Sequence, residues 1–115
     1  MNTDLKDGWT KQKLIEHVKA NFKGKSIDNN MCLYRGPEGK KCVIGLFIPD
    51  SETNLLSKIE GEGALTVWHR IDKFVPFKDK YMAYEFQRAH DLLSSESVEE
   101  QTQELVDWLE KNVPN

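Results

Sequence analysis

The fold of this chain is decided by residues 32–50, which read Cys32-Leu-Tyr-Arg-Gly-Pro-Glu-Gly-Lys-Lys-Cys42-Val-Ile-Gly-Leu-Phe-Ile-Pro-Asp50. Gly36-Pro-Glu-Gly39 is typical of a tight turn, because proline fixes φ and glycine can adopt a positive φ. Residues 42–48 form an unbroken apolar run, which is typical of a strand buried on both faces, and Pro49 lacks the backbone donor needed to extend it. The stretch therefore predicts a β-hairpin over about residues 31–48.

Helices are predicted on both sides of this hairpin. Apolar residues at helical spacing and polar N-caps predict long helices over residues 10–23, capped by Thr10, 79–93, capped by Asp79, and 97–112, opened by the capping box of Ser97 and Glu100. A short helix is predicted over 54–59. Residues 65–71 match helix and strand templates in part, so they could be a short helix, an irregular segment or a third strand. The predicted fold class is α+β, with a small antiparallel sheet packed against three to five helices.

The length of 115 residues is that of one domain, with residues 1–9 expected to be frayed and Trp9 to anchor them. No apolar run reaches the length of a membrane helix, and the N-terminus lacks the features of a signal peptide. We therefore expect a cytoplasmic protein with reduced thiols and no membrane partner. The net charge of −3 argues against direct binding to nucleic acid.

The two cysteines are candidates for redox chemistry. Cys32 and Cys42 would share a face if they were directly opposed across the hairpin, whereas a register shifted by one residue would pair Leu33 with Cys42. The sequence leaves this open and favours two buried thiols that pack as small apolar groups. Their spacing and the scattered histidines do not fit a metal site. The glycine turns lack the context of a nucleotide-binding loop, so no cofactor is expected.

A nucleophilic site can be drawn from three residues. Cys42 would act as the nucleophile, His90 as the base and Asp50 as the group that orients the base. Asp91 is the next residue after His90 and should point about 100° away on a helix, which makes Asp50 the better orienting group. No glycine-rich oxyanion turn flanks Cys42, so the sequence favours a binding protein over an enzyme.

The C-terminal region is a candidate binding surface. Residues 91–115 hold seven acidic side chains and one lysine, a balance of −6, whereas residues 1–45 have a balance of +4. Such an asymmetry suits electrostatic recognition of a basic protein, although a solvated helix face would look the same. The candidate binding residues are Glu99, Glu100, Glu104, Asp107 and Trp108.

One pattern resembles a known group of proteins. Cys32-x-Tyr34-Arg-Gly-Pro-x-Gly39, Cys42-x-Ile44-Gly45-x-x-Ile48-Pro49-Asp50 and Gln87-x-x-His90-Asp91 together resemble an uncharacterised family of small bacteriophage and prophage proteins. The resemblance covers about half of the chain. It implies the cytoplasm of a bacterial host, and it suggests that Cys42, Asp50 and His90 converge in space. It carries over no catalytic residues.

Three functions follow as hypotheses. The leading one is a phage-type accessory protein that binds a host or phage protein and inhibits a host defence or regulatory factor. The first alternative is a small cysteine-nucleophile hydrolase or transferase that uses Cys42 and His90. The second is a module that sequesters a small ligand in a pocket between the hairpin and the helix 79–93.

Overall fold

The computed structural model describes residues 4–28 and 31–114. Five α-helices and two 3₁₀ turns account for most of its regular structure. In chain order the elements are α1 (Lys11–Asn21), β1 (Ile27–Asp28), β2 (Met31–Cys32), η1 (Pro37–Gly39), η2 (Gly45–Phe47), α2 (Thr53–Ile59), α3 (Trp68–Ile71), α4 (Lys80–Asp91) and α5 (Val98–Asn112).

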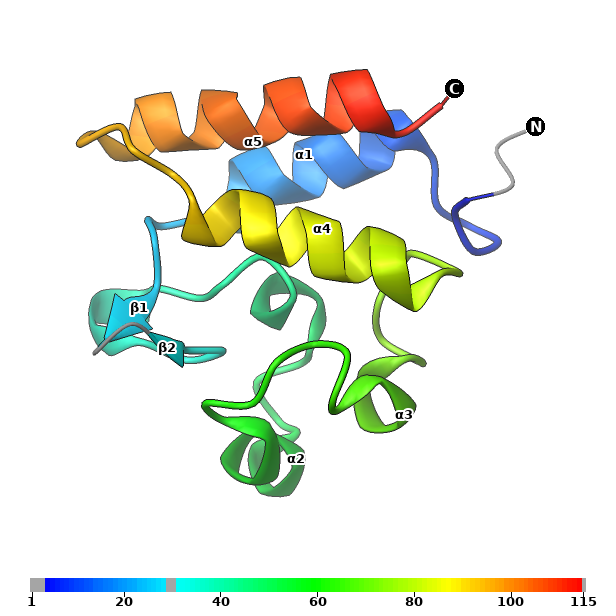
Figure 1. The fold of residues 1–115 in the computed structure, drawn as a ribbon, viewed down its shortest axis with the longest axis vertical. Helices are drawn as coiled ribbons and strands as arrows, with labels where there is room; N and C mark the ends of the chain where they lie inside the picture. Colours follow the sequence, from blue (N-terminus) through cyan, green and yellow to red (C-terminus); the bar gives the residue numbers. More distant parts are fainter. Residues whose placement is uncertain (1–3, 29–30, 115) are drawn as a thin grey trace.

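The long helices form one layer of the molecule. α5 lies alongside α1, and α4 packs against α5 (Figure 1). The short helices α2 and α3 lie on the far side of the chain segment that contains η2 (Figure 1). α1 and α5 pack against each other and contribute their apolar stripes to the core, through the buried side chains of Leu14, Ile15, Val18, Leu105, Val106 and Leu109.

The predicted N-caps of the long helices are confirmed. The side chains of Thr10 and Asp79 accept hydrogen bonds from the backbone N–H groups of Lys13 and Tyr81. The Ser97 hydroxyl accepts from the Glu100 N–H, which is the serine half of the predicted capping box, and donates to the Glu100 carboxylate. These bonds satisfy N–H groups that a helix leaves unpaired in its first turn.

The prediction of an α+β fold built on a hairpin over residues 31–48 is wrong. The sheet consists of two-residue strands, β1 and β2, which pair with each other in antiparallel register, Ile27 with Cys32 and Asp28 with Met31. The 42–48 segment is buried throughout, as its apolar character predicted, but it forms turns and η2 instead of a strand. An apolar run indicates burial and does not by itself specify the backbone conformation.

A remnant of the predicted pairing exists near the turn. The backbone N–H of Cys42 donates to the carbonyl of Leu33 at 3.2 Å, and Gly36 N–H donates to the carbonyl of Lys40 at 2.8 Å. The ladder does not continue beyond Cys42. Whether the Cys32 thiol could meet Cys42 lies outside the described side chains.

Two further segments differ from expectation or resolve an open choice. Of residues 1–9, which are expected to be frayed, residues 1–3 lie outside the described part of the chain, and Leu5 is buried and forms a β-bridge with Phe77. Trp9 serves as the predicted anchor, with its ring edge-on to Phe47 at a centroid distance of 5.5 Å. Residues 65–71 form turns that lead into the four-residue helix α3.

Candidate functional site

The 42–48 segment is held in place by Arg35 instead of a neighbouring strand. The Arg35 guanidinium donates through Nη1 to the carbonyls of Tyr34 and Gly45, both at 2.9 Å, and through Nη2 to the carbonyl of Ile48. A buried carbonyl without a donor is costly, and a guanidinium offers five donors in a fixed plane. Arg35 therefore replaces part of the hydrogen-bond ladder that a strand would have supplied.

The residues around Arg35 are fixed in turn by α2 and its C-terminal end. The Glu60 carboxylate accepts from the backbone N–H groups of Tyr34 and Arg35, at 2.7 and 3.1 Å. The hydroxyl of Tyr34, which is almost fully buried, donates to the carbonyl of Glu62. Residues 34–35, 45–48 and 60–62 thus form one connected polar network.

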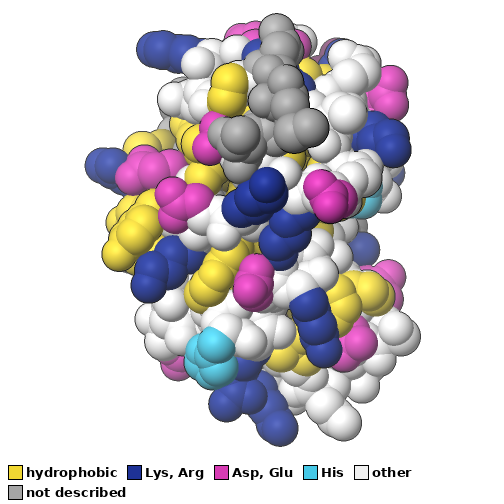
Figure 2. Space-filling model, turned by 90° about the vertical axis from the view of Figure 1, so that its right-hand side faces the viewer, with side chains coloured by type: hydrophobic (Ala, Val, Ile, Leu, Met, Phe, Trp, Pro, Cys, Tyr) yellow, Lys and Arg dark blue, Asp and Glu magenta, His cyan; other side chains and the backbone are white. Residues whose placement is uncertain are grey.

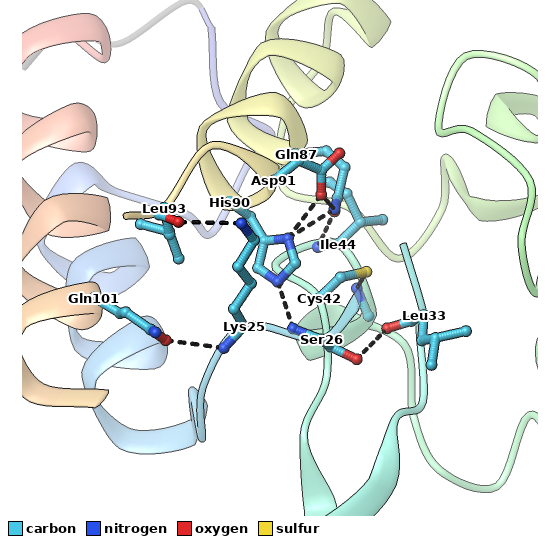
Figure 3. Close-up of polar contacts among 11 residues, drawn as sticks. Lys25, Ser26, Leu33, Cys42, Ile44, Gln87, His90, Asp91, Leu93 and Gln101 are labelled. Carbon is cyan, nitrogen blue, oxygen red and sulfur yellow. Dashed lines mark hydrogen bonds and ion pairs between the residues drawn. The ribbon is translucent and has the colours of Figure 1, made fainter. Parts of the chain in front are cut away.

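His90 lies at the centre of a second buried network (Figure 3). Its Nε2 accepts a hydrogen bond from the backbone N–H of Ser26 at 3.0 Å, so the ring proton is on Nδ1, 2.9 Å from Oδ1 of Asp91. Gln87 donates to the same oxygen of Asp91 at 3.1 Å and accepts from the backbone N–H of Ile44. The imidazole is fully buried, and it joins α4 to the chain that follows α1.

The three residues of the predicted nucleophilic site do not converge in the way that catalysis would need. Cys42 is fully buried, and its sulfur accepts a hydrogen bond from the Gly45 N–H at 3.4 Å. In Figure 3 the sulfur points away from the His90 ring. A nucleophile needs access to substrate and a base within hydrogen-bond reach. The arrangement therefore gives Cys42 a packing role.

Asp50 also lies elsewhere than predicted, because it pairs with two basic side chains instead of His90. Its Oδ1 is 2.9 Å from Nη2 of Arg35 and 3.2 Å from Nζ of Lys41. The hydrogen bond and charge of Lys41, together with Arg35, lower the pKa of this carboxyl below its usual value of 3.8. The group that orients His90 is Asp91, which the helical geometry of adjacent residues had argued against.

A small pocket opens beside the His90 network. It has a volume of about 150 Å³ and lies between α4 and the turn after α2. Its lining residues are Tyr34, Glu62, Gly63, Ala64, Tyr84, Gln87, Arg88 and Asp91. The pocket borders the predicted helix 79–93, but of its lining residues Tyr34 alone comes from the predicted hairpin 31–48. Its volume is below the roughly 300 Å³ at which small-molecule sites usually begin.

The predicted binding residues of α5 divide into two groups. Glu104 has a structural role, because its carboxylate accepts hydrogen bonds from the backbone N–H and the hydroxyl of Ser95. Glu99, Glu100 and Asp107 are exposed. With Glu110, which is also exposed and lies 3.5 Å from Lys11, they fall within an arc of about 100° on the helix surface. These four residues are the acidic face of α5, and Lys111 lies at its border.

Trp108 lies outside the acidic face, in a groove between α5 and the start of α4. This α4–α5 groove has a volume of about 400 Å³ and is lined by Asp79, Tyr81, Met82, Glu85, Trp108 and Asn112. One face of Trp108 stacks on Phe86 at a centroid distance of 5.3 Å, and the remainder of the half-buried ring borders the groove. Figure 2 views the molecule from the end where the described chain termini lie and shows exposed apolar side chains along its left edge, among charged ones.

Several residues that organise these sites were missed from the sequence. Arg35, Glu60, Gln87 and Ser26 have no periodic signal, because their partners lie 10 to 64 residues away. The one available hint was the pattern Gln87-x-x-His90-Asp91, because residues three apart lie on the same side of a helix and Gln87 is therefore a neighbour of His90.

Within residues 4–28 and 31–114, no helix has the length and apolar character required to cross a membrane. Over the same residues, no group of three or more His, Cys, Asp or Glu side chains could hold a metal ion. Comparisons with protein-family models, with curated proteins and with solved structures found no match to this chain.

Proposed function

We propose that this protein binds a basic host or phage protein through the acidic face of α5 and, as in the phage-type accessory role suggested by the sequence, blocks it sterically. The observation that carries the proposal is the acidic face itself. Four carboxylates (Glu99, Glu100, Asp107 and Glu110) lie on one side of a helix whose opposite side is buried on α1 and α4. Clustered charge of one sign steers the approach of an oppositely charged partner and sets its orientation.

The surroundings of α5 support a surface that meets a partner. The helix is at the edge of the molecule, where α1 and α4 cover only its inner side (Figure 1). The α4–α5 groove adds exposed aromatic area next to the charge, with Tyr81 exposed to 59%. Interfaces commonly combine an aromatic anchor with a charged rim.

Affinity capture from bacterial lysate with matched charge variants tests this function. Glu99→Lys/Asp107→Lys reverses two charges on the acidic face, and Glu16→Lys/Glu38→Lys reverses two exposed charges outside it. We expect basic proteins captured by the wild type to be lost with the first variant, retained with the second, and released by salt. The proposal fails if both variants capture the same proteins as the wild type.

A second candidate function rests on the pocket beside His90. Its position agrees with a small-ligand module, and Arg88 and Asp91 offer charges of both signs at its rim. The volume of about 150 Å³ limits the ligand to a few heavy atoms, which is why protein binding is the leading proposal. Titration with small zwitterions such as free amino acids, followed by amide NMR shifts at Gln87 and Asp91, distinguishes the two functions.

A further inference from the structure

We infer that the α4–α5 groove is the seat for an arginine side chain of the basic partner. This inference rests on the proposed function and names the chemical group that anchors the partner. The groove combines two carboxylates, Asp79 and Glu85, with the aromatic rings of Tyr81 and Trp108. Among the described residues that line it, none carries a positive charge.

Both carboxylates can form an additional or replacement ion pair with a cation from solvent. Asp79 is fixed by its role as N-cap of α4, in which Oδ1 accepts the Tyr81 N–H at 2.8 Å and the second carboxylate oxygen is not part of the cap. Glu85 lies nearly two turns along the same helix and pairs with Nη1 of Arg88 at 4.0 Å, with both side chains more than half exposed. A pair that long and that exposed is weak, so Glu85 can exchange it for an incoming guanidinium.

The aromatic rings favour a cation over a neutral group. Tyr81 already has an ammonium group above its ring, because Nζ of Lys80 lies 5.4 Å from the ring centroid. Tryptophan is the residue type whose ring attracts cations most strongly. The ring of Trp108 is held in place by stacking on Phe86. The lining therefore offers charge and π-faces together, which is the chemistry that recognises a cationic side chain.

Arginine fits this lining better than lysine does. A guanidinium is planar, so it can stack on an aromatic ring while its N–H groups point outward in the plane toward carboxylates. An ammonium is a compact and strongly hydrated charge that loses more hydration on entry. The volume of about 400 Å³ also leaves room for the full length of an arginine side chain.

The probes for the test are the Nα-acetyl amides of arginine, lysine and citrulline, whose side chains are free. Citrulline is a neutral analogue of arginine. The readout is the NMR shift of the Trp108 indole N–H, assigned by its disappearance in Trp108→Phe. We expect the arginine probe to shift this signal, the lysine probe to bind about threefold more weakly and the citrulline probe about tenfold more weakly. Equal binding by citrulline and arginine, or stronger binding by lysine, would overturn the inference.

Matched variants separate the groove from the general charge of the protein. Asp79→Asn keeps a capping oxygen at the start of α4, so Asp79→Asn/Glu85→Gln removes two charges with little cost to the fold. Glu16→Gln/Glu38→Gln removes two exposed charges outside both the groove and the acidic face of α5. We expect the first variant to weaken arginine binding at least about fivefold and the second to leave it within about twofold. Equal effects of the two variants would contradict a local site.

The two proposals can fail separately. If the arginine probe does not shift the Trp108 signal but reversing charges on the acidic face abolishes capture, only the arginine seat is refuted. If the probe binds the groove but capture is unaffected by that reversal, the groove is a cation site and the acidic face of α5 is not the binding surface.

Discussion

Nε2 of His90 accepts a hydrogen bond from the backbone N–H of Ser26, across 64 residues of sequence and at a distance of 3.0 Å. The bond joins the last turn of α4 to the chain that leaves α1, in a place that solvent does not reach. Replacing His90 by leucine keeps an apolar side chain of similar bulk but leaves the Ser26 N–H and the Asp91 carboxylate without this partner.

We expect His90→Leu to lower the free energy of unfolding by about 2–3 kcal/mol, because a buried donor without an acceptor bears its full desolvation cost. His90→Gln can still present an oxygen near the position of Nε2, and we expect it to lose less than half as much. Urea unfolding followed by circular dichroism measures both variants. A loss below about 0.5 kcal/mol in His90→Leu would mean that the bond contributes little to stability.

Gly45 is required for space, since a Cβ at this position would lie 2.5 Å from the carbonyl oxygen of Tyr34 and 3.2 Å from Nη1 of Arg35. Gly45→Ala should destabilise the protein by about 1–3 kcal/mol, as overpacking does elsewhere. Gly63→Ala is the matched control, because a Cβ at Gly63 would meet no atom within 4 Å. Equal midpoints of thermal unfolding for the two variants would contradict this prediction. They would show that the 42–48 segment can shift to accommodate a Cβ at position 45 at little cost.

The Cys42 thiol should be protected from alkylation in the native protein. With Cys32 replaced by serine, we expect iodoacetamide to react with Cys42 at least about 100-fold more slowly in buffer than in urea, because the sulfur is reached only when the structure opens. Mass spectrometry of the quenched reaction gives the rate. Rapid modification in buffer would restore Cys42 as a candidate nucleophile.

The Asp50 carboxylate should make stability depend on pH. Lys41 and Arg35 lower its pKa in the folded protein, so its stabilising effect is complete above the usual value of 3.8 and is lost as the pH falls through the lowered folded pKa. The stability difference between the wild type and Asp50→Asn should therefore be constant near neutral pH and shrink in acid. Urea midpoints measured across this range provide the test, and a difference that grew on acidification would have the wrong sign.

The features that can be predicted from the sequence are those decided by contacts between residues close together in the chain. The caps at Thr10, Asp79 and Ser97 are made with residues two or three positions away, so their chemistry can be read from a short window. The exposure of Asp107 follows from the helical periodicity, which places it on the side of the helix away from buried Leu105 and Leu109.

Features decided by residues far apart in the chain could not be predicted in this way. The apolar character of residues 42–48 predicted burial correctly, but the choice between strand and turn depends on Arg35 and Gln87, which reach the segment from other parts of the chain. Asp91 was judged unsuitable because successive helical residues diverge. Its Oδ1 nevertheless lies 2.9 Å from Nδ1 of His90, at the C-terminal end of α4.

The guanidinium of Arg35 has a kinetic consequence. Its partners Gly45, Ile48 and Asp50 are only 10, 13 and 15 residues further along the chain. Closing a loop of this length costs little chain entropy and takes a small fraction of a millisecond, whereas the bond between Ser26 and His90 must close a loop of 64 residues. We therefore expect residues 34–50 to form a compact loop early in folding and α4 to dock onto it late.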